Sequence, residues 1–392
     1  MQLEPTSATD GSEVSLIADS RGSWWRDRWC AIRDDLLASR RFQRWAAGFP
    51  LTRPIARRRA HDLFDICAGF VYSQVMFSCV RLRLFHILRD GPQTAETLAG
   101  RLSLTIAATR CLLAAAASLR LVESRGASRF GLGALGAAIV GNPDIGAMVE
   151  HHALLYADLQ DPVALLRGEI HTTSIGQFWS YARSNRADDA SAAEVAAYSS
   201  LMSLSQAMLA DDIIDAYSFA RHRCLLDVGG GEGGFLASVA ARAPKLRLLL
   251  FDLPAVAARA AERFAACGIA DRAEAIGGDF RRDALPGDAD VACLLRVLHD
   301  HDDRTAMDIL RAVHRALQPG GTLLVGEPMS DDKGTDPVGP AYFGFYLLAM
   351  GSGRPRRPGE IVELLKMAGF GAIQRRSTRQ PMLTRLIVSR RL

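Results

Sequence analysis

The spacing of apolar residues changes near residue 223, where short apolar runs begin to alternate with amphipathic stretches of helical length. The runs are 224–228, 246–251, 274–276, 291–295 and 322–325, and the helical stretches lie near 234–243, 254–267 and 302–317. This alternation predicts an α/β domain over 223–392 with a doubly wound, Rossmann-like parallel sheet. After a helix over 359–368, two further strands, 371–374 and 383–388, are expected at one edge of the sheet.

Before residue 223 the pattern is mainly helical and predicts four segments. Residues 1–20 are polar and aperiodic, which is typical of a disordered tail. Residues 21–59 form a basic helical extension, 60–140 a winged helix, and 141–222 a set of helices joined by polar turns.

In the winged helix, Thr94 and Thr105 are each placed to cap a helix, and two short strands follow. A DNA-reading helix would present polar and basic side chains. The second helix here offers Arg110 followed by leucines and four alanines. It therefore predicts packing, and no nucleic-acid partner is expected.

The extension contains eleven arginines, three aspartates and four of the five tryptophans: Trp24, Trp25, Trp29 and Trp45. One interpretation is a helix on an anionic membrane surface, with tryptophans at the interface and arginines on headgroups. The other is a helix packed on its own domain or on a second subunit. Asp27, Asp34 and Asp35 interrupt the basic face and favour the second interpretation.

Composition narrows the protein class. The 392 residues are 49% hydrophobic and 23% charged, which is ordinary for a globular protein of two domains. No run of membrane-spanning length and no signal peptide are recognised, so a cytoplasmic location is expected. The seven scattered cysteines show no metal-ligand spacing and predict reduced thiols without a metal. Of the 47 basic residues 44 are arginine, so arginine clusters carry little weight.

The chemistry is organised around 225–233, where an apolar run ends in Asp227-Val228 and gives way to four glycines in five residues. This is how a parallel strand enters a tight turn and a helix N-terminus at a nucleotide-type pocket. Glycine is needed there because a Cβ would block the turn and hold the backbone away from a ligand. Glu232 is unfavourable beside a pyrophosphate and favours a phosphate-free, cationic ligand such as S-adenosylmethionine.

Further candidates stand at the ends of the next strands. Asp252 is suited to a ribose diol, and Asp279 and Phe280 to the amine and ring of an adenine. His299 follows the fourth strand as a candidate general base, although an exposed loop histidine is the alternative. Glu327 follows the fifth strand, where it could orient His299 through the far imidazole nitrogen.

These motifs have a family counterpart. The motifs Asp-Val-Gly-Gly-Gly-x-Gly, Phe-Asp-Leu-Pro, Gly-Gly-Asp-Phe, Arg-Val-Leu-His-Asp and Gly-Glu-Pro stand in this order behind a winged helix. This arrangement resembles the S-adenosylmethionine-dependent O-methyltransferases of the caffeic acid and acetylserotonin type, a class I methyltransferase fold.

The resemblance implies a homodimer formed by the winged-helix domain, which also contributes to the partner's substrate pocket. It implies His299 as the base with Glu327 in support, and S-adenosylmethionine as cofactor. The implied cofactor-binding residues are Asp227, Gly229, Gly231, Asp252, Asp279, Phe280 and Arg296. The sequence departs from the plant pattern at His301, where an aromatic is missing, and near 353–356, where a second glutamate is missing.

Segments 68–74, 151–159 and 342–353 show a narrower resemblance, to the carotenoid 1-hydroxy O-methyltransferases of purple photosynthetic bacteria. That implies a lipophilic acceptor such as demethylspheroidene or hydroxyneurosporene. It also leaves open peripheral contact with the inner or photosynthetic membrane. The rival hypotheses are a methyltransferase for a phenol or another small aromatic metabolite, a non-catalytic winged-helix regulator, and a nicotinamide oxidoreductase, which Glu232 disfavours. The sequence does not fix which carotenoid is used or whether one or both ends are methylated.

Overall fold

The computed structural model describes residues 13–126, 128–183, 209–330 and 337–392. The chain divides into two compact units, Met1–Met76 and Phe77–Leu392. The first contains α1 (Glu13–Ala38), α2 (Arg40–Gly48) and the start of α3 (Arg53–Arg81), which continues into the second. Because α1 begins at Glu13, the helix includes residues that the sequence pattern had assigned to a polar tail ending at residue 20.

Helix α3 is long and apolar enough to cross a membrane by length and composition, and 6% of the qualifying window is buried. No apolar run of that length was expected, and α3 departs from that expectation on this measure. Its apolar residues are mixed with small and polar ones such as Ser73, Gln74 and Ser78, so they do not form an uninterrupted run.

The winged helix predicted over 60–140 is present in the second unit. Its elements are α4 (Leu84–Arg89), β1 (Gln93–Thr94), α5 (Ala95–Leu102), α6 (Ile106–Ser118), β2 (Val122–Ser124), β3 (Arg129–Leu132) and α7 (Ala134–Gly141), and the strands pair in the order β1-β3-β2. Both predicted caps are confirmed. The Thr94 hydroxyl accepts a hydrogen bond from the Thr97 amide, and the Thr105 hydroxyl accepts one from the Ala108 amide.

Helices α8 (Pro143–Asp158), α9 (Pro162–Leu166) and α10 (Ser174–Arg183) follow, as the sequence predicted for this region. The buried Asp158 carboxylate accepts hydrogen bonds from the amides of Ser174 and Ile175 and so caps α10. Residues 184–208, which include the polar stretch 184–189 and the methionines Met202 and Met208, lie outside the described residues. Residues 209–216 form a helix within the segment 141–222 that was expected to be helical.

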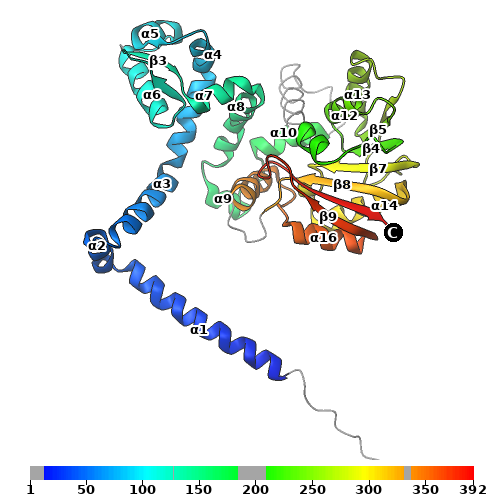
Figure 1. Cartoon of the computed structure of the whole chain (residues 1–392), viewed down its shortest axis with the longest axis horizontal. Helices are drawn as coiled ribbons and strands as arrows, with labels where there is room; N and C mark the ends of the chain where they lie inside the picture. The colour runs from blue at the N-terminus through cyan, green and yellow to red at the C-terminus, as the bar shows by residue number, and fades with distance from the viewer. Residues whose placement is uncertain (1–12, 127, 184–208, 331–336) are drawn as a thin grey trace, which may run out of the picture. The chain divides into compact units, whose positions relative to one another are not determined.

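The C-terminal domain contains the predicted parallel sheet with an antiparallel edge (Figure 1). The strand order is β6-β5-β4-β7-β8-β10-β9, and β10 runs antiparallel to β8 and β9. The strands are β4 (Cys224–Val228), β5 (Arg247–Asp252), β6 (Ala273–Gly277), β7 (Ala289–Leu295), β8 (Leu317–Glu327), β9 (Phe370–Arg376) and β10 (Arg385–Arg391). The helices are α12 (Gly234–Arg242), α13 (Pro254–Ala266), α14 (Asp303–Ala316) and α16 (Pro358–Met367).

Both faces of the sheet are buried, which explains why its strands read as continuous apolar runs. Leu225 packs in the cluster that includes α12 and α13, whereas Leu226 packs in the cluster that includes α14 and α16. This is because successive strand residues point to opposite faces.

Strands β4 to β8 pair in parallel, so their carboxyl ends share one edge of the sheet, where the candidate residues stand.

Candidate active site

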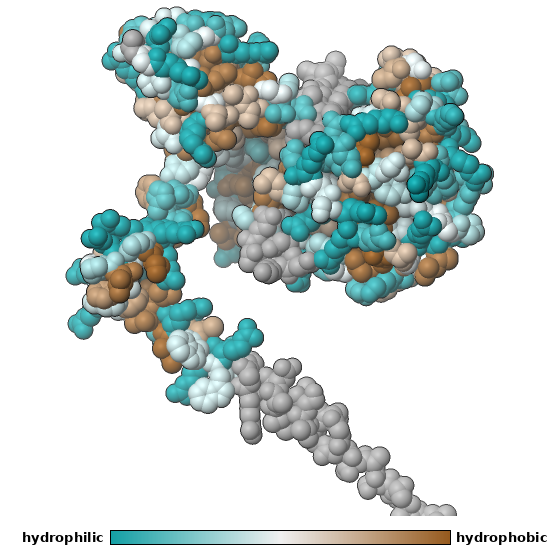
Figure 2. Space-filling view, in the orientation of Figure 1, coloured by the Kyte–Doolittle hydropathy of each residue, from teal (hydrophilic) through white to brown (hydrophobic). Residues whose placement is uncertain are grey.

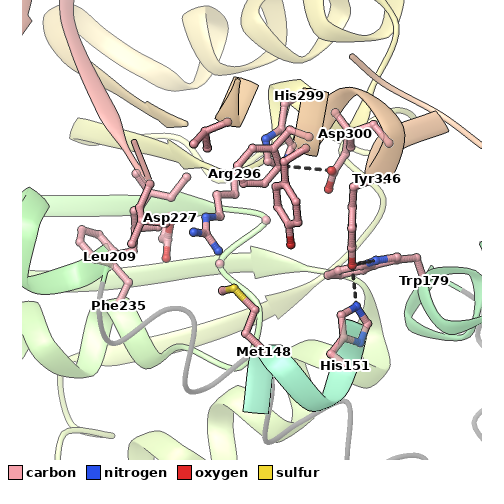
Figure 3. Close-up of a pocket in the computed structure, with 18 residues that line it drawn as sticks. Met148, His151, Trp179, Leu209, Asp227, Phe235, Arg296, His299, Asp300 and Tyr346 are labelled. Atoms are coloured by element: carbon pink, nitrogen blue, oxygen red, sulfur yellow. Dashed lines mark hydrogen bonds and ion pairs between the residues drawn. The ribbon is translucent and has the colours of Figure 1, made fainter. Parts of the chain in front are cut away.

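A cavity lies at the carboxyl edge of the parallel strands (Figure 3). It encloses about 1220 Å³, including its mouth. One side is formed by the ends of β4 and β7. The other is formed by α8, α10, the π-helix η3 (Val338–Phe343) and α15 (Gly344–Met350). Its lining residues are Met148, His151, Trp179, Leu209, Asp227, Gly229, Gly230, Phe235, Leu295, Arg296, His299, Asp300, Val338, Tyr342, Phe343, Tyr346, Leu347 and Leu383.

The turn after β4 requires glycine, as predicted. Gly229 and Gly231 have φ values of +71° and +60°, a backbone region that side chains disfavour. A Cβ on Gly229 would also lie 2.8 Å from a methyl of Val297. The bare backbone of the turn therefore faces the cavity and leaves room for a ligand to approach closely.

Asp227 is 1% exposed, and neither carboxylate oxygen has a hydrogen-bond partner among the residues that the structure describes. Burial, and then the charge of Asp252, raise the pKa of Asp227 to about 8. Such a buried, unpaired carboxyl group is costly unless a ligand pairs with it. Its position suits a cationic or hydrogen-bond-donating part of a bound molecule.

Asp252, at the end of β5, supports the same turn. Its two carboxylate oxygens accept hydrogen bonds from the amides of Gly231, at 2.8 Å, and Leu253, at 2.7 Å. Burial raises its pKa even though these N–H groups act in the opposite direction. Each oxygen retains a lone pair, so the predicted bond to a ribose hydroxyl is compatible with this arrangement.

The two adenine candidates are placed differently. The Asp279 carboxylate accepts hydrogen bonds from the guanidinium and amide of Arg281, which hold its pKa below the ordinary value. The Phe280 ring packs edge-on against His301, with ring centres 5.6 Å apart. Neither lines the cavity, so their adenine role stays a prediction.

Glu232, which the sequence analysis used to argue for a cationic ligand, is paired within the protein. Its carboxylate lies 2.9 Å from Arg259 and 3.5 Å from Arg263, both on α13. The negative charge of Glu232 is therefore balanced by its own domain. The reason given for preferring a cationic ligand was wrong, and Asp227 supplies a better one.

His299 is 7% exposed and stands on the short 3₁₀-helix η2 (Leu298–Asp300) beside the cavity. Its Nε2 lies 3.0 Å from a carboxylate oxygen of Asp300, whereas Nδ1 has no partner among the described residues. Burial lowers the pKa of His299, but the charges of Asp300 and Glu327 raise it more, so the net shift is upward. The pairing with Asp300 favours a proton on Nε2, which leaves the lone pair of Nδ1 available.

Glu327 does not hold the imidazole, contrary to the prediction. One of its oxygens accepts hydrogen bonds from the backbone amides of Leu298, at 2.5 Å, and His299, at 3.2 Å. Glu327 thus positions the turn, and Asp300 holds the ring. Asp300 is part of the His-Asp motif, but no sequence pattern predicts that its carboxylate contacts the preceding side chain.

The segment after α15 braces the turn from behind. The buried guanidinium of Arg356 donates to the carbonyls of Leu298 and His301 and to the carboxylate of Asp303. A Cβ on Gly353 would lie 2.0 Å from the His299 carbonyl oxygen, which shows how closely the two backbones approach. The region that lacks the plant-type glutamate therefore contributes an arginine and a glycine contact instead.

Arg296, directly after β7, is half-buried beside the cavity with a left-handed φ of +56°. Burial lowers its pKa, and its Nε has no partner among the described residues. Of the residues singled out in the sequence, Asp227, Gly229, Arg296 and His299 line the cavity, whereas Gly231, Asp252 and Glu327 do not. Figure 3 shows Asp227, Arg296 and His299 around it.

The far wall of the cavity is aromatic, and its polar atoms are paired with one another. The Tyr346 hydroxyl lies 2.7 Å from Nε2 of His151 and accepts a hydrogen bond from the Trp179 indole at 2.8 Å (Figure 3). Burial, with a smaller contribution from His152, lowers the pKa of His151 to about 4, so its ring is neutral near pH 7. This wall therefore presents ring faces without charge.

No group of three or more potential metal ligands occurs within the described parts of the chain.

Two protein-family models match the chain, and together they span most of the second unit. Residues 156–371 match the model of an O-methyltransferase domain, and residues 64–141 match that of an O-methyltransferase dimerisation domain.

Named relatives and solved structures agree with these matches. Demethylspheroidene O-methyltransferase of Cereibacter sphaeroides is 43% identical over 340 residues, which cover 86% of this chain and 89% of the relative. Acetylserotonin O-methyltransferase of Mus musculus is 32% identical, covering 84% and 89%. The structure of human N-acetylserotonin methyltransferase in complex with SAM has a TM-score of 0.69 at 24% identity, covering 85% of this chain and 97% of that one. The mitomycin 7-O-methyltransferase structure has a TM-score of 0.70 at 26% identity, covering 86% and 100%.

Proposed function

The chain belongs to the S-adenosylmethionine-dependent O-methyltransferase family, and on that premise we propose that it methylates the 1-hydroxyl of an acyclic carotenoid of the demethylspheroidene or hydroxyneurosporene type. S-adenosylmethionine is its methyl donor, and the family's dimerisation domain over 64–141 makes it a homodimer. The observation that carries the choice of acceptor is the uncharged aromatic wall opposite His299. A relative 43% identical over most of the chain carries the matching name.

The residues present suit S-adenosylmethionine. The glycine turn leaves space for close backbone approach, and the unpaired Asp227 carboxyl offers a partner for a positive centre. Asp252 has the capacity to accept from a ribose hydroxyl. We assign Asp227, Gly229, Gly231, Asp252 and Arg296 to this ligand, with Asp279 and Phe280 as the expected adenine contacts. When bound, the cofactor supplies a methyl group activated by its sulfonium charge.

The chain's own residues handle the proton. Nδ1 of His299 accepts it from the acceptor hydroxyl, while Asp300 holds the proton already on Nε2. A tertiary alcohol is a much weaker acid than imidazolium, so proton removal accompanies the transfer and does not precede it. General-base help of this kind is typically worth about 10²–10⁴-fold. The aromatic wall positions the acceptor and excludes water.

Labelled S-adenosylmethionine, the purified dimer and a detergent-solubilised hydroxycarotenoid test this function, with product identified by mass. We expect His299→Ala and His299→Gln to lower turnover by about 10²–10⁴-fold. His86→Ala, at an exposed histidine outside the cavity, should leave turnover unchanged. Methylation of a simple catechol but not of the carotenoid would favour a small aromatic acceptor. Near-wild-type turnover of either His299 variant would refute the assignment of the base.

We also propose that residues 21–59 contact an anionic membrane, where a carotenoid acceptor resides. Between Leu36 and His61 there are seven arginines and no acidic residue, and the three aspartates all lie in α1. On α2, Trp45 is 53% exposed and stacks on Phe49, at 5.1 Å between ring centres. Figure 2 shows apolar and polar side chains side by side over this segment. Exposed aromatic residues beside arginines are typical of interfacial helices.

Co-sedimentation with phosphatidylglycerol vesicles, compared with phosphatidylcholine vesicles, tests this contact without reference to activity. The triple variant Arg40→Gln, Arg41→Gln, Arg44→Gln should lose binding to anionic vesicles, at about 1 kcal/mol per arginine. Removing Arg26, Arg28 and Arg33 from the acid-containing α1 in the same way is the control. Equal binding by all three proteins would refute the contact.

A further inference from the structure

A second hollow adjoins the cavity across the ring of Tyr342. Its lining residues, among those that the structure describes, are all uncharged: Leu155, Leu159, Pro162, Ala341, Tyr342 and Phe345. It encloses about 680 Å³, including the part open to solvent. Tyr342 lines both this groove and the cavity that holds His299.

Tyr342 is held where it can separate the two spaces. It belongs to the π-helix η3, and its hydroxyl lies 2.7 Å from Nε2 of His152 on α8. Because that bond satisfies the hydroxyl, the ring presents carbon to both sides. Burial raises the pKa of Tyr342 to about 12, so the ring is uncharged near neutral pH.

The groove walls come from elements that pack on one another. Leu155 and Leu159 lie on and just after α8, Pro162 begins α9, and Phe345 is on α15, which contacts both α8 and α9. The groove is thus built into the same helical layer as the aromatic wall. A single side chain, that of Tyr342, separates the groove from the site.

We infer that this groove binds the hydrocarbon tail of the acceptor. The inference rests on the proposed function, because it needs an acceptor whose reacting hydroxyl stands at one end of a long, rigid polyene. The cavity must hold that hydroxyl beside His299 together with the methyl donor, so the rest of the chain must leave it. The groove across Tyr342 is an apolar, uncharged route, and it makes tail length a determinant of specificity.

Filling the groove without touching the cavity tests the inference. Ala341→Trp and Leu159→Trp place bulk in the groove from opposite walls, and Val163→Trp adds the same bulk at an exposed position of α9 outside it. Each variant is assayed with a detergent-solubilised acyclic hydroxycarotenoid and with a short tertiary terpene alcohol that carries the same hydroxyl end. Thermal melting and S-adenosylmethionine affinity report folding, and light scattering reports the dimer.

We expect kcat/KM for the carotenoid to fall about 10- to 200-fold in both groove variants, with cofactor affinity, the dimer and turnover of the short alcohol unchanged. The Val163→Trp enzyme should match the wild type. Undiminished carotenoid turnover in folded groove variants would overturn the inference while leaving the proposed function intact. Loss of the dimer in those variants would overturn it in favour of a partner subunit in the groove. If the wild type methylates no carotenoid, the proposed function fails and the groove assignment fails with it.

Discussion

Replacing Asp300 by asparagine removes the charge beside the His299 imidazole and keeps the shape of the side chain. The asparagine oxygen can still accept a hydrogen bond from Nε2–H of His299, so the ring orientation is preserved. What changes is the relative stability of the imidazolium. The pKa of His299 is raised in the wild type, and the activity of a base is lost as the pH falls through its pKa. The variant should therefore stay active to lower pH.

The size of the shift follows from the geometry. An opposite charge within hydrogen-bond distance typically moves a pKa by about 1–3 units, each unit corresponding to about 1.4 kcal/mol. The Nε2–carboxylate distance is 3.0 Å, but the Asp300 side chain is 25% exposed, and solvent screens part of the interaction. We therefore expect the acid limb of the profile to move to lower pH, by less than a fully buried pair would give.

The measurement is kcat/KM for the acceptor against pH at saturating S-adenosylmethionine. Because every enzyme molecule then has the cofactor bound, the effect of Asp227 protonation on cofactor affinity does not enter the measured profile. Asp302→Asn is the matched control, because Asp302 is an exposed helix cap two residues further on and asparagine caps equally well. An acid limb that stays at the wild-type pH in Asp300→Asn would refute the claim that this pair sets the pKa of the base.

Three further predictions concern the glycine turn at the cofactor site and the turn that carries His299. The Asp227 carboxyl has a pKa of about 8 in the free protein, and a cationic ligand favours its ionised form. Affinity for S-adenosylmethionine should therefore rise as the pH rises to about 8, and calorimetry in different buffers should show that binding releases a proton. An affinity that does not change with pH would contradict this. Gly229→Ala should weaken that affinity about 5- to 150-fold, since strain of about 1–3 kcal/mol arises at the binding turn. Gly268→Ala, with a φ of +66° and open space around it, should lower thermal stability without changing affinity, and equal affinity losses would count against the close-approach argument. Glu327→Gln retains an oxygen for the two buried amides and should keep most activity. Glu327→Ala leaves both amides unpaired, which should lower the free energy of unfolding in urea by about 1–3 kcal/mol for each amide. Similar losses in both variants would point to the charge of Glu327 instead.

The fold was largely predictable because its signals are local. Strands buried on both faces give apolar runs, and Thr94 and Thr105 cap their helices through bonds three residues away. The glycine turn is equally local, since Gly229 and Gly231 need their conformations whatever lies nearby.

The partners of the site residues were not predictable in the same way. Glu232 pairs with Arg259 and Arg263 on α13, the helix that follows the next strand, β5. Arg356 donates to the carbonyl of Leu298, which lies more than fifty residues earlier in the chain. Tyr342 and His152 are 190 residues apart. Such pairs depend on how the helices pack, and a single sequence carries no periodic signal for them.

The bracing of η2 by Arg356 has a consequence for how the enzyme is completed during synthesis. The hydrogen bonds between the glycine turn and Asp252 involve no residue beyond Leu253. The turn that carries His299 instead contacts Gly353, Arg354 and Arg356, about a hundred residues beyond Leu253 along the chain. The residues that support the glycine turn are therefore synthesised well before those that hold His299 in place. A product that ends before residue 353 would contain every motif through Gly-Glu-Pro but would lack Arg356 and also β10, the strand that pairs with β8, so it would lose the support of His299 together with part of the sheet.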